Sequence, residues 1–205
     1  MPQLKVCGIN DAAFAVEAAR RGIDFLGLIF AAKSPRCVTV ESARRIADAV
    51  RASAANPPRF VGVFVRHSAA EIAEIASAVG IGVVQLHGEY TAEDVAFLKS
   101  GGYEVWILHS HDSAAEESAD AVLLDGRDGA RCGGTGMRAD WSLVEELKRN
   151  RRRVVLAGGL SSANIAEAAS TGADVLDVNS SIETSPGVKS LDLLAELLES
   201  YRSAV

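Results

Sequence analysis

A lysine and a cysteine in one predicted strand are the first residues whose types and spacing could do chemistry. The stretch Lys5-Val6-Cys7-Gly8-Ile9 is short, apolar and typical of a buried β-strand. Side chains alternate across a strand, so Lys5 and Cys7 share one face. A cation near a thiol favours the thiolate, which is the reactive form of cysteine. The alternative is a small apolar cysteine that fills the core, and this stretch alone leaves both interpretations open.

Polar side chains also occur in or just after other apolar runs of the sequence: Gln85 and His87 in one run, Asp125 at the end of another, and Arg36 after a third. A guanidinium such as that of Arg36 suits bidentate recognition of a carboxylate, although an ordinary surface charge would look the same in the sequence. His87 is equally explained as a binding residue or as a histidine of the core. Lys33 and Arg66, which lie in similar places, are better explained as solvated charges.

Glycine and serine residues close two further runs. Gly158-Gly159 leads directly into a predicted helix, and Asn179-Ser180-Ser181 follows the last apolar run. Backbone N–H groups and helix N-termini bind phosphate, so these two segments predict a phosphate site. A third cluster, 133–136 with Gly134 at its centre, lies in the longest irregular segment. It is either a plain turn or a loop that closes over a ligand.

The elements that must position these residues alternate regularly between strands and helices. Eight apolar runs predict strands, at 5–9, 25–30, 60–65, 83–87, 105–108, 121–125, 153–157 and 175–178. Helical periodicity or capping signals follow each run, with helices expected near 11–22, 41–53, from 68, and at 91–100, 113–118, 140–150, 161–170 and 190–202. At roughly 25 residues per unit, this order predicts one α/β domain over residues 1–205, a (β/α)8 TIM barrel.

A doubly wound open sheet is the alternative to the barrel. It is disfavoured because the chain has no early Gly-x-Gly-x-x-Gly and because polar residues recur at the C-terminal ends of the strands. In a barrel of this kind, those ends are where the chemistry takes place.

The bulk composition excludes several classes of protein. A chain of 205 residues with 48% hydrophobic residues can bury a real core, and a formal charge of −6 argues against a general nucleic-acid binder. Three distant cysteines, Cys7, Cys37 and Cys132, fit neither a disulfide framework nor a zinc site. The sequence opens with no secretory pattern and has no apolar run near 18 residues, so we expect a cytoplasmic protein that does not enter membranes.

Taken together, the motifs resemble the phosphoribosylanthranilate isomerase family of tryptophan biosynthesis. The similar blocks occur in order over nearly the whole chain, at 5–9, 34–36, 61–65, 85–88, 124–125, 133–136, 156–160 and 177–187. The chain departs from the family's usual residues at Asn10, Ala139, Ser162, Ser181 and Ser190. Ser181, which replaces a usual glycine, puts the geometry of the phosphate site in question.

The resemblance implies an Amadori isomerisation of N-(5-phosphoribosyl)anthranilate by general acid–base catalysis, with no cofactor and no metal. It implies Cys7 as the base, Asp125 as the acid and Arg36 as the contact to the anthranilate carboxylate. With the residues above, the expected substrate-binding set is Arg36, Gln85, His87, Gly134, Gly158, Gly159, Asn179, Ser180 and Ser181. The expected partner is a small phosphorylated substrate, and the expected state is a monomer or homodimer.

The chemistry of such a reaction agrees with these roles. An acid must protonate the furanose ring oxygen as the ring opens to a Schiff base, and a base must then remove the C2′ proton. Near neutral pH, Asp125 needs a raised pKa to act as the acid, and Cys7 must be partly thiolate to act as the base.

Two other functions are compatible with a barrel of this size. A metal-dependent sugar-phosphate isomerase or epimerase would carry His and Asp at several strand ends, whereas here only His87 and Asp125 lie so. A degenerate barrel that merely binds a phosphorylated metabolite would have no need of both Cys7 and Asp125.

Overall fold

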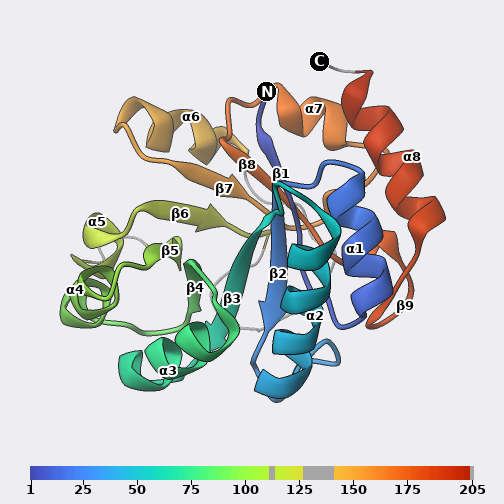
Figure 1. The fold of residues 1–205 in the computed structure, drawn as a ribbon. Coiled ribbons are helices and arrows are strands. Elements are labelled where there is room, and N and C mark those ends of the chain that lie inside the picture. Colours follow the sequence, from blue (N-terminus) through green and yellow to red (C-terminus); the bar gives the residue numbers. More distant parts are fainter. Residues whose placement is uncertain (111–113, 127–140, 204–205) are drawn as a thin grey trace.

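Eight parallel strands close into a barrel with helices around it (Figure 1). The computed structural model describes residues 1–110, 114–126 and 141–203. The strands are β1 (Gln3–Val6), β2 (Phe25–Ile29), β3 (Arg59–Val65), β4 (Val83–His87), β5 (Glu104–Leu108), β6 (Ala121–Leu124), β7 (Val154–Leu156) and β8 (Val175–Val178). The prediction of a (β/α)8 barrel is confirmed, and the open sheet is wrong because β1 pairs with both β2 and β8.

The helices lie outside the barrel. They are α1 (Ala12–Arg20), α2 (Val40–Ser53), α3 (Ala69–Val79), α4 (Ala92–Ser100), α5 (Ala114–Ser118), α6 (Ser142–Arg149), α7 (Ile165–Ala169) and α8 (Leu191–Arg202). Their apolar faces pack on the outer face of the sheet in one large core cluster. Ser68 and Glu71 form a capping box at the start of α3, and Thr91 and Asp94 form another at α4.

The barrel interior changes in character from one end to the other. At the N-terminal end, Glu104 accepts hydrogen bonds from Arg59 (2.7 Å), Arg153 (2.5 Å) and the indole of Trp106 (2.6 Å). An apolar middle follows, made of inward-facing residues of most strands: Phe25, Val61, Val83, Trp106, Ala121, Leu123, Val155, Ala157 and Val175. Three polar side chains are also buried, Lys5 on β1, Gln85 on β4 and Asp177 on β8. The interior is therefore filled, and its reactive groups lie toward the C-terminal mouth, the end at which the strands finish.

The first and last elements of the chain contact each other where β1 pairs with β8 and closes the barrel. Register pairs Lys5 with Asp177 and Val6 with Val178 between β1 and β8. In Figure 1, α8 lies beside α1, and the Tyr201 hydroxyl donates a hydrogen bond to the Pro2 carbonyl oxygen. Residues from the two ends of the sequence therefore lie together where the barrel closes.

The segment after β8 contains structure that the sequence patterns did not predict. A 3-10 turn, η1 (Ser180–Ile182), leads into a small hairpin of β9 (Glu183–Ser185) and β10 (Val188–Lys189). Asn10, one of the departures from the family pattern, donates a hydrogen bond to the Gly187 carbonyl (2.9 Å). The hairpin is thereby held against the loop after β1.

Helix α7 is shorter than predicted. The sequence favoured a helix from 161 to 170, but residues 162–164 form a turn and the helix begins at Ile165. The Asn164 side chain accepts from the Ser161 N–H (2.8 Å) and donates to the Gly159 carbonyl (3.0 Å). Asparagine competes with the helix for backbone groups in this way, so the helix starts later than its periodicity suggests.

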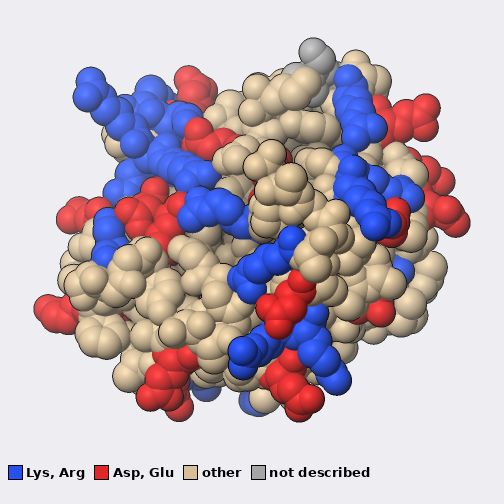
Figure 2. Space-filling model, viewed as in Figure 1, with Lys and Arg blue, Asp and Glu red and all other residues tan. Residues whose placement is uncertain are grey.

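Charges of both signs share the surface shown in Figure 2. Cations of the basic stretch 148–153 form ion pairs with acidic side chains. Lys148 Nζ lies 2.7 Å from Asp174 Oδ1, and Arg153 Nη1 lies 2.5 Å from Glu104 Oε1. No helix within the described part of the chain is both long and apolar enough to span a membrane.

Candidate active site

Cys7 lies at the C-terminal mouth, immediately after β1, and is 5% exposed. It packs with Ile29 and Val63, and its N–H donates to the Val178 carbonyl (2.8 Å). A Cβ on Gly27 would lie 2.9 Å from the Cys7 sulfur, which is too close for a real contact. The neighbouring strand therefore carries a glycine where the thiol needs room.

Lys5 and Asp177 form a buried ion pair next to this thiol. The Lys5 ammonium lies 2.6 Å from Asp177 Oδ2, and the two side chains are 0% and 6% exposed. Burial alone would lower the pKa of Lys5, but the Asp177 carboxylate and the Cys7 sulfur raise it above its usual value. Burial raises the pKa of Asp177 although Lys5 opposes the shift. The lysine is thus held as a cation inside the barrel.

Burial, more than the Lys5 cation, governs the ionisation of Cys7. Burial raises the pKa of Cys7, and the Lys5 cation offsets only part of that effect. Asp177 raises the pKa further by charge repulsion. The sequence revealed the cation but not the Asp177 carboxylate, which pairs with the same lysine and favours the thiol form of Cys7.

Asp125 follows β6 and is half-buried. Its Oδ1 atom lies close to Gly158, where an added Cβ would be 2.9 Å from it. Its charge also raises the pKa of Asp177. Asp177 therefore interacts electrostatically with both Cys7 and Asp125.

Arg36 is held by a carboxylate of the protein itself. Its Nε and Nη2 atoms donate to the two oxygens of Glu183 at 2.8 and 2.6 Å. Lys189 also contacts Glu183 at 2.8 Å and donates to both oxygens of Asn179 at 2.8 Å. A guanidinium has five N–H donors, so three donors of Arg36 have no partner among the described residues and could bind a second carboxylate.

The charges of this second network are strongly coupled. Burial alone would raise the pKa of Glu183, but hydrogen bonds from Arg36 and Lys189 lower it to about 2. Burial lowers the pKa of Lys189 although Glu183 opposes that shift. Hydrogen bonding to Glu183 raises the pKa of Arg36. Glu183 is thus a fixed anion that orients two cations at the mouth.

Gln85 and His87, both on β4, contact each other. Gln85 Nε2 lies 2.7 Å from His87 Nε2, and Gln85 is 2% exposed. If the amide donates this bond, His87 Nε2 is the acceptor and its proton lies on Nδ1. The Gln85 carbonyl oxygen is buried without a hydrogen-bond partner among the described residues, so it can accept one from a ligand.

Gly158 and Gly159 have the backbone expected of a tight anion-binding turn. Their φ angles are +84° and +67°, in the left-handed region that favours glycine. A Cβ on Gly158 would lie 2.2 Å from the Gly126 nitrogen, so only glycine fits there. Because β7 and β8 are neighbours, this turn lies beside the segment 179–181.

Ser181 fits its position without strain. Ser180 and Ser181 belong to η1, and neither has a positive φ, which settles the question raised by serine in place of the family's glycine. The Ser181 hydroxyl is buried without a hydrogen-bond partner in the described part of the chain. Asn179, the third member of this segment, already accepts from Lys189 through its side-chain oxygen.

The other predicted residues lie elsewhere. Gly134 lies outside the described residues, and Lys33 and Arg66 are exposed, as expected for solvated charges. Among the described residues, no group of three or more His, Cys, Asp or Glu side chains could hold a metal ion.

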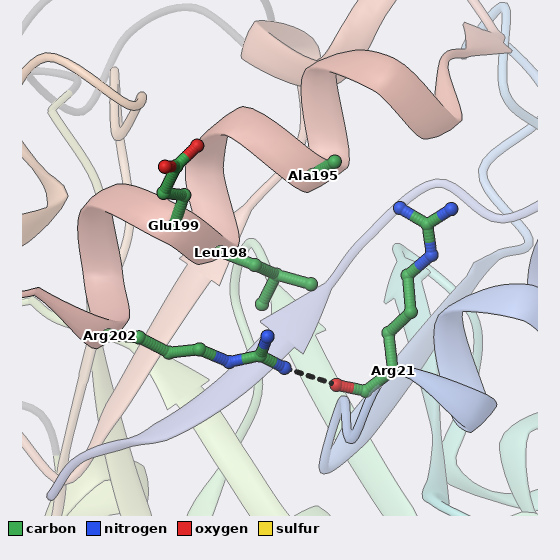
Figure 3. Close-up of a pocket in the computed structure, with 5 residues that line it drawn as sticks. All are labelled: Arg21, Ala195, Leu198, Glu199 and Arg202. Atoms are coloured by element: carbon green, nitrogen blue, oxygen red, sulfur yellow. Dashed lines mark hydrogen bonds between the residues drawn. The ribbon is translucent and has the colours of Figure 1, made fainter.

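A hollow of about 400 Å³ lies outside the barrel, between α1 and α8 (Figure 3). Its lining consists of Arg21, Ala195, Leu198, Glu199 and Arg202. Arg202 spans it and donates to the Arg21 carbonyl (3.0 Å). It shares no residue with the mouth of the barrel, so we do not connect it with the chemistry.

Sequence reasoning missed the partners of these side chains. Asp177, Glu183 and Lys189 each complete an ion pair at the mouth, yet none was singled out as a site residue. A signal was available for Asp177, because a carboxylate within the apolar run 175–178 must be paired when buried.

Comparison with known proteins identifies the family. A sequence model described as N-(5'-phosphoribosyl)anthranilate (PRA) isomerase matches residues 4–200. This chain belongs to that family.

Relatives and a solved structure agree with the assignment. The chain is 38% identical to the N-(5'-phosphoribosyl)anthranilate isomerase of Zymomonas mobilis, with 97% of each protein covered. It is 39% identical to the tryptophan biosynthesis protein TrpCF of Vibrio cholerae over 97% of this chain, but spans only 42% of that protein.

A crystal structure of phosphoribosyl anthranilate isomerase with reduced 1-(o-carboxyphenylamino)-1-deoxyribulose 5-phosphate superposes with a TM-score of 0.81 at 29% identity. The alignment covers 99% of this chain and all of the other. The PRA isomerase fold therefore extends over the whole barrel described above.

Replacing Glu183 by glutamine tests the second ion network. We expect Glu183→Gln to lower the free energy of unfolding by about 1–3 kcal/mol near pH 7, because a buried anion with two cationic partners is lost. The folded-state pKa of about 2 lies below the ordinary value of 4.5. The difference from the parent should therefore persist above about pH 4.5 and shrink as the pH falls toward 2.

Urea unfolding of both proteins at about pH 7, 5 and 3 measures this difference. Glu145→Gln is the matched control, because Glu145 and Arg149 form an exposed pair 3.9 Å apart that contributes little. A deficit for Glu183→Gln that stays constant over this pH range would contradict the assignment.

Proposed function

We propose that this chain converts N-(5-phosphoribosyl)anthranilate to 1-(2-carboxyphenylamino)-1-deoxyribulose 5-phosphate, a step of tryptophan biosynthesis. The observation that carries the proposal is the match of the PRA isomerase family over residues 4–200, together with Cys7 and Asp125 at the mouth of one barrel. We also propose that all 205 residues form a single domain, that the enzyme works in the cytoplasm, and that it is a monomer or homodimer.

Asp125 is the general acid in this proposal. It protonates the ring oxygen of the ribose as the furanose opens to a Schiff base. Its position beside the Gly158 turn supports this role, because the same turn is proposed to hold the phosphate end of the substrate. The ring oxygen is joined to that end through the sugar, so an acid at this point is near the bond that breaks.

Cys7 is the general base. As a thiolate it removes the C2′ proton from the Schiff base and gives an enolamine, which then ketonises. The thiol of the free enzyme must therefore lose its proton before it can act. Its burial beside Lys5 supports the role, because a thiolate formed there has a cation next to it.

Arg36 binds the anthranilate carboxylate, and the turn at 158–159 with the segment 179–181 binds the phosphate. Glu183 occupies one edge of the guanidinium and so presents the remaining N–H groups in a fixed direction. The buried Ser181 hydroxyl adds a donor to the backbone N–H groups of the phosphate site. Gln85 and His87 line the mouth between these two ends.

The direct test of this function is activity in the cell and in solution. We expect the gene to restore growth without tryptophan to a bacterial strain that lacks the isomerase, and the purified protein to consume the substrate in the presence of a chelator. Failure of both experiments would reject the proposed function.

The acid and the base are tested by conservative substitutions. We expect Cys7→Ala and Asp125→Asn each to lower kcat by on the order of 10²–10⁴, the usual size of an acid–base contribution, while KM changes little. Cys37→Ala, at an exposed cysteine, is the matched control and should keep full activity. Near-normal turnover in either variant would remove that residue from the mechanism.

Carboxylate recognition is tested at Arg36. We expect Arg36→Met to raise the Kd of the product by roughly 10²-fold, because a charge-assisted pair is lost. An analogue without the carboxylate should lose much less. Lys33→Met, at an exposed cation of the same loop, is the control. Equal losses for the product and the analogue would contradict the assignment.

The phosphate site is tested at Gly159. We expect Gly159→Asp to abolish measurable substrate binding without unfolding the protein, because it places a carboxylate beside the phosphate. Gly159→Asn is the matched control, since asparagine has the same size and tolerates the left-handed backbone. If both variants bind substrate as the parent does, the phosphate lies elsewhere.

A further inference from the structure

Three ionisable side chains are buried together inside the mouth, and the acid–base mechanism uses only one of them. Cys7, Lys5 and Asp177 are 5%, 0% and 7% exposed. Lys5 donates to Asp177 Oδ2 at 2.6 Å and also interacts with the Cys7 thiol. The second oxygen, Asp177 Oδ1, is buried without a hydrogen-bond partner among the described residues. Asp177 Oδ1 can therefore accept a further hydrogen bond, in a buried site where an anion without a partner is energetically unfavourable.

The charges of this group do not balance if all three side chains ionise. Lys5 supplies one positive charge, whereas Cys7 and Asp177 could supply two negative ones. Lys5 can neutralise only one of them, and burial penalises the other. The pKa values of Cys7 and Asp177 are both raised, mainly by burial, as expected when two acids compete for one cation. In such a group, the protonation steps belong to the pair and not to either residue.

We propose that Cys7 and Asp177 share a single proton through Lys5, so that Cys7 becomes the catalytic thiolate when the proton lies on Asp177. An Nζ–H bond of Lys5 breaks as Asp177 Oδ2 takes its proton. The freed nitrogen lone pair then takes the proton of the Cys7 S–H bond. Lys5 ends with the charge it had, the thiol has become a thiolate, and the carboxylate has become a carboxylic acid.

The transfer keeps the net charge of the buried group at zero. Before it, the group holds a lysine cation and a carboxylate; after it, a lysine cation and a thiolate. No further charge is buried in either state, so the large cost of an isolated buried ion is avoided. Asp177 is in this sense a positioning residue that acts through Lys5 and Cys7. The proposal rests on the proposed role of Cys7 as the base.

Other charged groups also face this site. Lys189 on β10 lowers the pKa of both Cys7 and Asp177. Arg36 interacts with the Cys7 sulfur, and Asp125 raises the pKa of Asp177. The test variants leave these three residues unchanged, so differences between variants report on Lys5 and Asp177.

The test is a titration of the Cys7 thiolate by ultraviolet absorbance in ligand-free protein. Cys37→Ser and Cys132→Ser in every variant leave Cys7 as the single thiol. We expect Asp177→Asn to lower the pKa of Cys7 by at least about one unit, a tenfold gain in thiolate, because Lys5 then has only the sulfur as a counter-ion. Lys5→Met should raise that pKa by a similar amount, and the double variant should lie between the two.

Asp174→Asn is the matched control, because Asp174 also pairs with a lysine but lies at the N-terminal end of β8. We expect its Cys7 titration to equal that of the parent. An unchanged or raised pKa of Cys7 in Asp177→Asn would overturn the proposal.

A second measurement does not require the ion pair to be altered. The infrared spectrum of the parent, minus that of Cys7→Ala, should contain a protonated-carboxyl band over the pH range in which the thiolate is present. The absence of that band would overturn the proposal even if Asp177→Asn did not fold. Neither titration needs substrate, so a protein without isomerase activity would reject the proposed function and still report on the shared proton.

Catalysis gives an independent signature. With Asp177→Asn, the acid limb of the pH profile of kcat/KM should move to lower pH, while kcat on the plateau falls about threefold per unit of pKa because a thiolate of lower pKa is a weaker base. A purely structural role for Asp177 would lower activity without moving the limb, and that result would contradict the proposal.

Discussion

The buried ion pair between Lys5 and Asp177 is the interaction on which the mouth of this barrel depends. It crosses the junction of β1 and β8, where the sheet closes, and its residues are 172 positions apart in the sequence. Two charges inside a barrel are tolerated only when each neutralises the other, because removal from water is costly for either alone. Register at the closure brings them together, and Cys7 is placed next to both.

A second ion network performs a different task with the same physics. Glu183 and Lys189 come from the small hairpin after β8, and Glu183 holds Arg36, which follows β2. The first network is poised to exchange a proton, since its two acids compete for one cation. The second is not, since Glu183 has two cations and a pKa of about 2. The two carboxylates thus differ in the number of their cationic partners: Asp177 pairs with Lys5, whereas Glu183 pairs with both Arg36 and Lys189.

Burial gives both networks their effect. Interactions between charges are stronger where water is excluded, so Lys5, Asp177 and Glu183 influence their neighbours far more than surface pairs such as Arg149 and Glu145 do. The same burial opposes the ionisation of Cys7. The proposed role of Cys7 as the base therefore depends on neighbouring charges that stabilise its thiolate.

The sequence by itself determined the order of strands and helices, the barrel and the family, because these depend on local periodicity and on motifs that are contiguous in the chain. It also placed Cys7, Asp125 and the glycine turn at the correct end of the barrel. Only the tertiary structure decided that Lys5 pairs with Asp177, that Glu183 holds Arg36, and that burial opposes the ionisation of Cys7. Periodicity reports which face a side chain is on, but register and closure choose its partner, and burial sets its charge.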